Sequence, residues 1–306
     1  MRRKAEIVDL RFDLWGSGPK YPTIGGQQSL WVSCTTNADI AGLFRDGTSE
    51  KYPVDGVPRQ IALGGENIWF TMPLIDTVGR VDHEGANHNY KLPDGSAPDG
   101  IAATEAEAWV TLSGTGGLAR IPIDEEVQLV SPKVTGDDEL ADPPPAEPRF
   151  LAMDDRGSLW FTRQGRGDIV RMDTDHTTES WAEPGCAAPS AIAADQDAVW
   201  IADSNEPGIW RIGRAEKLLQ RVEPWPTGFA TAIASDQRGG CWFTEADEDL
   251  VGHFDGDSMI VEYDISEYGE KPRGLAVDRD GIAWVALRSG GIVGVRAGSV
   301  GGSRYA

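Results

Sequence analysis

The chain has 306 residues, and its 28 lysines and arginines against 49 aspartates and glutamates give a formal net charge of −21. A surface of that sign repels nucleic acid phosphates and anionic lipid headgroups, so we expect neither as a partner. Hydrophobic residues make up 40% and charged residues 25%, which is typical of a soluble globular protein and excludes a disordered one. Length alone suggests about two domains.

The cysteine content and the chain start bear on the compartment. Cys34, Cys186 and Cys241 form no CxxC motif, which excludes a disulfide framework and a zinc site of the usual spacing. The basic first residues lack the apolar stretch of a secretion signal, and no apolar run approaches the roughly 20 residues of a membrane-spanning helix. We therefore expect a cytoplasmic protein without a membrane partner, and we expect it to be a monomer.

Seven tryptophans recur at intervals of about 40 residues, each in a short strand-like run such as SLWVS or NIWFT. They are Trp31, Trp69, Trp109, Trp160, Trp200, Trp242 and Trp284. An apolar residue follows each of them at the same distance, from Ile40 in the first unit to Val293 in the last. We interpret the tryptophans as packing residues between repeats, because a buried aromatic ring contributes a large apolar area.

In chain order, the first predicted strand is Glu6–Phe12, which precedes the first tryptophan unit. A proline opens six of the seven units, and Ala230 takes its place in the sixth. These prolines are Pro19, Pro58, Pro98, Pro148, Pro189 and Pro272. Within a unit, the tryptophan strand is followed by a third strand, such as VGRV at 78–81, and by an outer strand, such as His88–Leu92. Glycine-containing turns separate these runs.

Two units depart from the common length. The third carries an acidic, proline-rich insertion at Thr135–Pro148, which is either a solvated loop or a lid or partner-docking segment. The seventh runs out at Arg296, so we expect residues 6–12 to supply its outer strand. Four short strands repeated seven times predict one all-β domain over residues 1–306, a seven-bladed β-propeller closed by an N-terminal strand.

The repeats carry a family resemblance. The run Leu159–Thr162 with Ile169–Arg171, and the run Trp242–Glu245 with Val251–Gly252, resemble the repeat of the virginiamycin B lyase (streptogramin lyase) family. The resemblance covers the whole chain. It implies a seven-bladed propeller closed by an N-terminal strand, and an enzyme that opens a cyclic depsipeptide at its ester by magnesium-dependent elimination. Mg²⁺ is thereby implied as a cofactor.

The resemblance also implies two histidines, each directly after the opening proline position of the last two units. This sequence has Thr231 and Arg273 at those places, whereas Glu245 matches the family's Trp-Phe-Thr-Glu run. We therefore expect a lyase- or hydrolase-type enzyme acting on a small, anionic, cyclic or ester-containing metabolite other than a streptogramin. The alternative is a non-catalytic propeller that binds a ligand or a protein.

Two sets of residues are predicted to line one mouth of the ring, because the turns that carry them lie at the same end of each blade. The first set follows the opening proline position and comprises Lys20, Arg59, Asp99, Arg149, Ser190, Thr231 and Arg273. The second set lies three residues after the tryptophan and comprises Cys34, Met72, Leu112, Arg163, Asp203, Glu245 and Leu287. Together they hold five cations and three anions, so the mouth is positive in an acidic chain.

These residues suggest roles. Guanidinium groups present a fork that matches a carboxylate or phosphate, so we expect the mouth to bind a small molecule. The predicted substrate-binding residues are Lys20, Arg59, Arg149, Arg163, Thr231 and Arg273. The predicted acid–base residues are Asp99, Asp203 and Glu245, which could also offer oxygen ligands to Mg²⁺ but come from three different units. The alternative is that the arginines simply pair with these acids. His83, His88, His176 and His253 fall outside the mouth positions.

Overall fold

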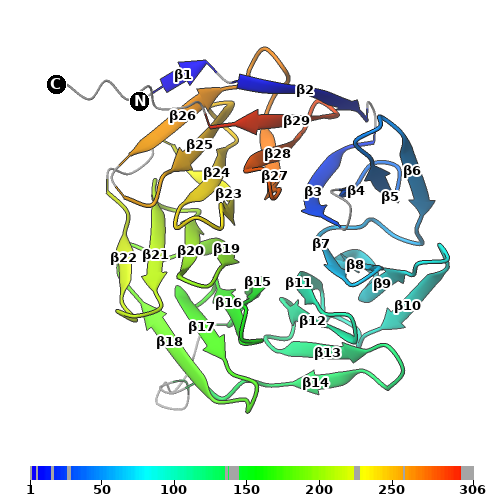
Figure 1. Ribbon diagram of the computed structural model, residues 1–306. Helices are drawn as coiled ribbons and strands as arrows, with labels where there is room; N and C mark the ends of the chain where they lie inside the picture. The colour runs from blue at the N-terminus through cyan, green and yellow to red at the C-terminus, as the bar shows by residue number, and fades with distance from the viewer. Residues whose placement is uncertain are drawn as a thin grey trace.

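The computed structural model describes residues 2–4, 6–14, 17–25, 29–134, 137, 145–223, 228–257 and 259–297. Seven antiparallel sheets stand around a central axis, with the innermost strand of each sheet facing that axis (Figure 1). The predicted all-β, seven-bladed propeller is confirmed. The single turn η2 (Pro73–Ile75) is a short helical segment, and the described residues contain no helix long and apolar enough to span a membrane.

The first four blades follow the chain from the inside outwards. Blade 1 contains β3 (Pro19–Ile24), β4 (Leu30–Cys34), β5 (Asp39–Leu43) and β6 (Ser49–Pro53). Blade 2 contains β7 (Ile61–Gly64), β8 (Asn67–Met72), β9 (Thr77–Val81) and β10 (Asn87–Lys91). Blade 3 contains β11 (Pro98–Ala103), β12 (Glu107–Leu112), β13 (Leu118–Pro122) and β14 (Gln128–Val130). Blade 4 contains β15 (Pro148–Met153), β16 (Leu159–Arg163), β17 (Asp168–Met172) and β18 (Thr178–Ala182).

The last three blades include both N-terminal strands. Blade 5 contains β19 (Pro189–Ala194), β20 (Ala198–Asp203), β21 (Ile209–Gly213) and β22 (Leu219–Arg221). Blade 6 contains β23 (Ala230–Ser235), β24 (Cys241–Glu245), β25 (Leu250–Phe254) and β26 (Ile260–Asp264), joined by β1 (Arg2–Lys4). Blade 7 contains β27 (Pro272–Val277), β28 (Ile282–Leu287) and β29 (Gly291–Arg296), joined by β2 (Glu6–Asp13).

The N-terminal strands close the ring at two places. As the sequence predicts, β2 pairs antiparallel with β29, from Glu6 opposite Arg296 to Asp13 opposite Gly291. The sequence did not predict that β1 pairs in parallel with β26 of the neighbouring blade. Consecutive residues of one short segment therefore join blades 6 and 7, and the outer edge of β29 is covered by a strand. Residues 298–306 lie outside the described part of the chain.

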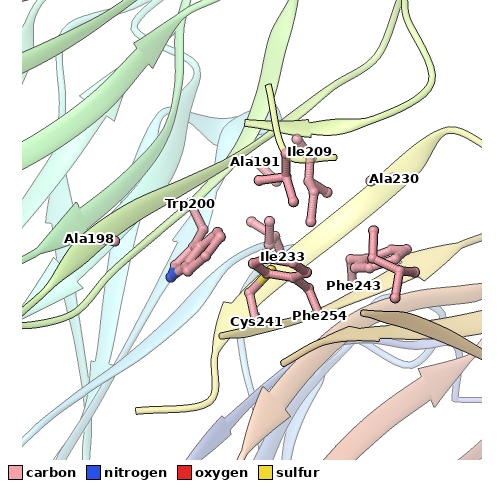
Figure 2. Packing of buried hydrophobic residues seen from close by; sticks show 12 residues of the cluster. Ala191, Ala198, Trp200, Ile209, Ala230, Ile233, Cys241, Phe243 and Phe254 are labelled. Carbon is pink, nitrogen blue, oxygen red and sulfur yellow. The ribbon is translucent and has the colours of Figure 1, made fainter. Parts of the chain in front are cut away.

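The core lies between neighbouring blades, where the predicted packing role of the tryptophans is seen directly. Trp200 of blade 5 packs with Ile233, Cys241 and Phe243 of blade 6 in one buried cluster (Figure 2). Second strands such as β20 and β24 are buried along their whole length, whereas an outer strand such as β6 is mostly exposed. Each blade therefore buries both faces of its second strand against its neighbours, which explains the near-continuous apolar runs around each tryptophan.

Candidate functional site

Six residues of the first predicted set stand at the start of their inner strands, where a bulge displaces them from regular pairing, whereas Arg59 precedes β7, which pairs with β8 without a register shift. In β15, Pro148 pairs with Arg163 and Leu151 pairs with Phe161, so the register shifts between them. The same shift occurs in β3, β11, β19, β23 and β27. A bulge bends the strand and re-aims a side chain, and here it directs the residue after the proline towards the central channel.

Side-chain hydroxyls fix the backbone of these mouth residues. Thr111 Oγ1 donates a hydrogen bond to the carbonyl oxygen of Arg149 in the next blade at 2.8 Å. Thr111 Oγ1 also accepts a hydrogen bond from the amide of Gly100, in its own blade, at 2.7 Å. Thr244 repeats the arrangement, with its hydroxyl 2.8 Å from the Arg273 carbonyl and 3.2 Å from the Ala232 amide. Each hydroxyl thus satisfies two backbone groups that the bulge removes from the ladder.

Glycines allow the blades to come this close at the mouth. A Cβ atom on Gly100 would lie 2.4 Å from the Arg149 carbonyl oxygen, and one on Gly274 would lie 2.4 Å from that of Lys20. Both distances are far below van der Waals contact, so neither position accepts a side chain without moving the next blade. The Pro-x-Gly pattern of these units is therefore a packing requirement that leaves only the middle residue free to vary.

Asp99 is the buried centre of a charge cluster on blades 2, 3 and 4. Its carboxylate lies 3.0 Å from Arg59 Nε and 3.4 Å from an Arg149 guanidinium nitrogen, and it accepts a hydrogen bond from Gln60 at 3.2 Å. The side chain is fully shielded from solvent. Burial raises the pKa of Asp99 above its usual value, and the two guanidinium groups oppose that shift. The sequence allows two roles for Arg59 and Arg149, which are ligand binding and pairing with acidic residues. This geometry is compatible with both, because each guanidinium contacts Asp99 and also borders the channel.

One cavity of the mouth combines aromatic and cationic groups. It has a volume of about 560 Å³, and we call it the aromatic pocket. Its apolar side consists of Tyr21, Phe150 and Phe229, and its cationic side consists of Arg59 and Arg149. The rings of Tyr21 and Phe150 meet edge to face at 6.2 Å, whereas Phe229 is 46% exposed without a described partner ring. An exposed phenylalanine at a cavity rim is a contact surface for an apolar ligand group.

A second cavity, of about 400 Å³, adjoins the first over blades 1, 6 and 7, and we call it the cationic pocket. The two pockets share Tyr21, Thr231 and Asp247. The cations that line the cationic pocket are Lys20, Lys271, Arg273 and Arg288. Among the residues that the structure describes, none of these four forms an ion pair with a carboxylate. Asp247 is the one acidic residue in the described lining.

Neighbouring positive charge lowers the pKa of two of these groups, Arg273 and Lys20. Burial, followed by the charge of Arg288, lowers the pKa of Arg273 below its usual value. Burial, followed by the charges of Arg59 and Arg273, lowers the pKa of Lys20 to about 8. The attraction of Asp99 opposes the latter shift but does not cancel it. Positive charge is therefore held in this pocket at an electrostatic cost that an anion would relieve.

The second predicted set does not line these two pockets. Each of its residues is buried. In every blade except blade 2, the second-set residue pairs with the first residue of the inner strand, which precedes the bulge. Arg163 points away from the channel and pairs with Asp168 and Asp137, in a separate cavity of about 260 Å³. Asp137 and residues 145–148 are the described parts of the insertion at 135–148, predicted to be a solvated loop or a lid or docking segment; its other residues lie outside the described ranges.

Of the three predicted acid–base residues, Asp99 contacts two cationic groups of the mouth, Arg59 and Arg149. Asp203 is fully buried and accepts hydrogen bonds from the backbone amides of Ala188, Asn205 and Glu206 at 2.7 to 3.0 Å. It therefore holds the turn after β20. Glu245 is buried at the end of β24, and a Cβ on Gly228 would lie 2.5 Å from its carboxylate, so residues of the preceding loop cover it.

The donor groups in the described part of the chain do not converge on a metal position. Asp99, Asp203 and Glu245 belong to blades 3, 5 and 6, and the described residues contain no group of three histidine, cysteine, aspartate or glutamate side chains that could hold an ion. Asp99 is engaged by two guanidinium groups and Asp203 by three amides. These contacts do not fit the oxygen-rich shell that Mg²⁺ requires, so we derive no chemistry through it.

The four histidines lie away from both pockets, as their sequence positions predict. The His253 ring packs at a tilt against Trp242, with the ring centroids 4.5 Å apart. It also contacts Asp236, which lies in the turn between β23 and β24, at 3.0 Å. His88 contacts Asp82 at 2.6 Å on the outer edge of blade 2. The cysteines are buried, and burial raises the pKa of the Cys34 thiol to about 12. Cys34 is therefore an inert thiol.

Sequence reasoning missed several residues of the mouth. Lys271 directly precedes the opening proline of unit seven, and Arg288 follows the second strand by one residue, so both flank positions that the repeat does identify. Tyr21 and Phe150 each follow a first-set residue, and Phe229 precedes Ala230. All five residues lie within two positions of a residue in one of the two predicted sets. Tyr21 and Phe150 lie within the shifted register of β3 and β15, where a bulge re-aims side chains.

Comparison with known proteins agrees with the repeat pattern. The sequence profile of the Virginiamycin B lyase family matches residues 5–295. The curated Virginiamycin B lyase of Nocardia farcinica is 26% identical over 283 residues, which cover 90% of this chain and 78% of that protein. A structure of streptogramin B lyase has a TM-score of 0.80 at 23% identity and covers 94% of this chain and 98% of its own.

A second solved structure extends the comparison. A catalytically inactive virginiamycin B lyase from Staphylococcus aureus, solved with quinupristin, has a TM-score of 0.81 at 22% identity, with 94% and 98% of the two chains covered. At these identities the structural likeness shows a common seven-bladed fold. The profile match spans nearly the whole chain, so this protein belongs to the Virginiamycin B lyase family.

Proposed function

We propose that the mouth of the propeller binds a small anionic molecule that also carries an apolar or aromatic part. The observation that carries this proposal is the cationic pocket, in which Lys20, Lys271, Arg273 and Arg288 have no described carboxylate partner. Four like charges around one cavity repel one another, and a carboxylate or phosphate would neutralise them and accept bidentate hydrogen bonds. The net charge of −21 lies elsewhere on the molecule and does not oppose such binding at short range.

The apolar part of the ligand is inferred from the adjoining aromatic pocket. Tyr21 borders both cavities, so a ligand whose anion lies near Arg273 would place its body against Tyr21, Phe150 and Phe229. The volumes of about 560 and 400 Å³ are in the range of small-molecule sites. Aromatic side chains favour edge or offset contact with a ring, so an aromatic anion suits the pair of pockets.

We further propose that the chain is a lyase- or hydrolase-type enzyme on an ester-containing or cyclic member of this ligand class. Membership of the Virginiamycin B lyase family supports this reading. The substrate we propose differs from a streptogramin, because Thr231 and Arg273 stand where the family resemblance implies histidines. A purely ligand-binding propeller is the second candidate, favoured by the structural engagement of Asp203 with three backbone amides.

Binding is tested by isothermal titration calorimetry with 3-phenyllactate and its uncharged methyl ester. The acid is expected to bind and the ester to bind at least tenfold more weakly, since a charge-assisted hydrogen bond contributes about 1.5–3 kcal/mol. Arg273→Ala and Arg288→Ala should each weaken the acid about tenfold or more. Lys51→Ala, which removes the same charge from exposed β6, is the matched control. Unchanged affinity in both arginine variants would refute the cationic-pocket assignment.

Turnover is tested separately by mass spectrometry of products from a panel of carboxylate-bearing esters and lactones, with a streptogramin B included. Product from a panel member, lost in Arg273→Ala, supports the enzyme. Tight binding of panel members without any product supports the second candidate. Cleavage of the streptogramin would contradict the proposed substrate class.

A further inference from the structure

Lys20 occupies a position unlike that of a surface lysine. It is the second residue of β3, at the bulge that directs it into the mouth, and it lines the cationic pocket. Its Nζ lies 5.2 Å from the centroid of the Tyr21 ring, and the side chain is half-buried. The amine therefore has an aromatic face on one side and the cavity on the other, so a ligand in the pocket can reach it.

The charged groups around this amine are mostly of its own sign. Arg59 and Arg273 face it from blades 2 and 7, and Lys271 and Arg288 line the same cavity. Two carboxylates oppose them. Asp99 is buried and engaged by Arg59 and Arg149, and Asp247 stands at the exposed rim. No described carboxylate forms an ion pair with Lys20.

This environment favours the neutral amine. Burial and the neighbouring guanidinium groups lower the pKa of Lys20 to about 8, so a substantial fraction is unprotonated at slightly alkaline pH. A lysine that is desolvated and placed beside other cations is activated as a nucleophile towards carbonyl compounds. Lys217, in contrast, contacts the Glu179 carboxylate at 3.1 Å on the outer surface.

We propose that Lys20 is a reactive amine that forms an imine with the carbonyl group of a carboxylate-bearing ligand, such as an aromatic 2-oxo acid. This inference rests on the anion binding proposed above, because Arg273 and Arg288 are assigned to hold the carboxylate while the carbonyl carbon lies at Lys20 Nζ. The amine lone pair forms the new C–N bond as the C=O π electrons move to oxygen. The resulting carbinolamine loses that oxygen as water together with the two amine protons, so no oxidant or reductant takes part.

The experiment traps this imine by reduction. The full-length protein is incubated at pH 8 with phenylpyruvate and sodium cyanoborohydride, then digested, and the modified lysines are identified by mass spectrometry. The reduced adduct on Lys20 is expected to exceed that on any other lysine at least tenfold. 3-Phenyllactate, which has the ring and carboxylate but no ketone, should suppress it by competition. Labelling should fall as the pH drops below about 8, because the amine becomes protonated.

Two variants separate the site from its surroundings. Lys20→Arg keeps the positive charge and should abolish the adduct at this position, whereas Lys217→Arg on the outer surface should leave the Lys20 adduct in place. Labelling spread evenly over the lysines, or insensitive to 3-phenyllactate, would overturn the proposal. If calorimetry shows that 3-phenyllactate binds while Lys20 stays unlabelled, only the imine inference fails. If neither binding nor labelling occurs, the proposed anion site fails as well.

Discussion

The Thr244 hydroxyl donates a 2.8 Å hydrogen bond to the carbonyl oxygen of Arg273 across the boundary between blades 6 and 7. Thr244 lies in the buried strand next to Trp242, and Arg273 lies at the mouth. The threonine of one blade thus sets the backbone of a candidate ligand-binding residue in the next. Thr111 has the same relation to Arg149, and Thr71 to Asp99 at 2.9 Å. The repeat therefore couples blade packing to the geometry of the mouth.

Replacing Thr244 by valine should both destabilise the protein and weaken anion binding. Valine fills the same volume but leaves the Arg273 carbonyl and the Ala232 amide without their partner, which costs about 1–3 kcal/mol for each buried group. Urea unfolding measures the loss of stability, and calorimetry with 3-phenyllactate measures affinity. Thr244→Ser keeps the hydroxyl and is expected to bind the anion as the wild type does. Equal affinity of the valine variant would show that Arg273 does not depend on this bond.

Asp99→Asn should increase anion affinity and change how stability depends on pH. The variant releases the guanidinium groups of Arg59 and Arg149 from a buried carboxylate, so we expect about tenfold tighter binding of 3-phenyllactate. Since burial raises the pKa of Asp99, its contribution to stability is full below its unfolded value and is lost as the pH rises through the folded value. The wild type should therefore gain stability relative to the variant on acidification. Parallel stability–pH curves for the two proteins would contradict this assignment.

The fold could be predicted from the sequence because its packing residues repeat at one per blade. Trp200 and Trp242 occupy equivalent positions in successive blades. Each is followed at the same sequence separation by an apolar residue of the third strand, Ile209 and Val251. The closing strand was also predictable, since the seventh unit lacks a fourth strand of its own. The parallel pairing of β1 with β26 was not, because three polar residues carry no hydrophobic pattern.

The site was predicted in part, for a reason that the bulges make clear. Lys20, Arg59, Arg149 and Arg273 follow the opening proline and do line the mouth. Residues such as Arg163 are three after the tryptophan and at the same end of the blade, but they lie before the bulge and are covered by neighbouring blades. The number of residues between a position and the tryptophan of its unit indicates at which end of the blade that position lies. The direction of its side chain depends on local register, which the repeat does not show.

Removing the N-terminal strands should test how the ring is closed. Deletion of residues 1–13 removes β1 and β2, exposes the edge of β29, and withdraws Ile7 and Val8 from the core. Full burial of such a side chain contributes about 1.5–3 kcal/mol, and Ile7 and Val8 are partly buried, so a loss of about 2 kcal/mol or more is expected in urea unfolding. The open edge should also promote association, detectable by size-exclusion chromatography.

A shorter deletion is the control for that experiment. Removing residues 1–5 takes away β1, which pairs through three residues with β26, but keeps the six paired residues of β2. This variant is expected to stay monodisperse and to lose less stability than the longer deletion. Equal stability of the wild type and the 1–13 deletion would refute the closing role of β2.

Lys20→Met should stabilise the protein at neutral pH, by an amount that shrinks as the solution becomes alkaline. The folded protein lowers the pKa of Lys20 from 10.5 to about 8, mainly through burial and then through Arg59 and Arg273. A group with a lowered pKa contributes stability that is full above its unfolded value and is lost as the pH falls through the folded value. At pH 7 the wild type therefore holds a charged amine in unfavourable surroundings, and methionine relieves that cost while filling a similar volume. Unfolding free energies at pH 7 and pH 9.5 measure the effect, with Lys51→Met on exposed β6 expected to show no such trend. A gain that is the same at both pH values would mean that the amine of Lys20 is not held against its charge.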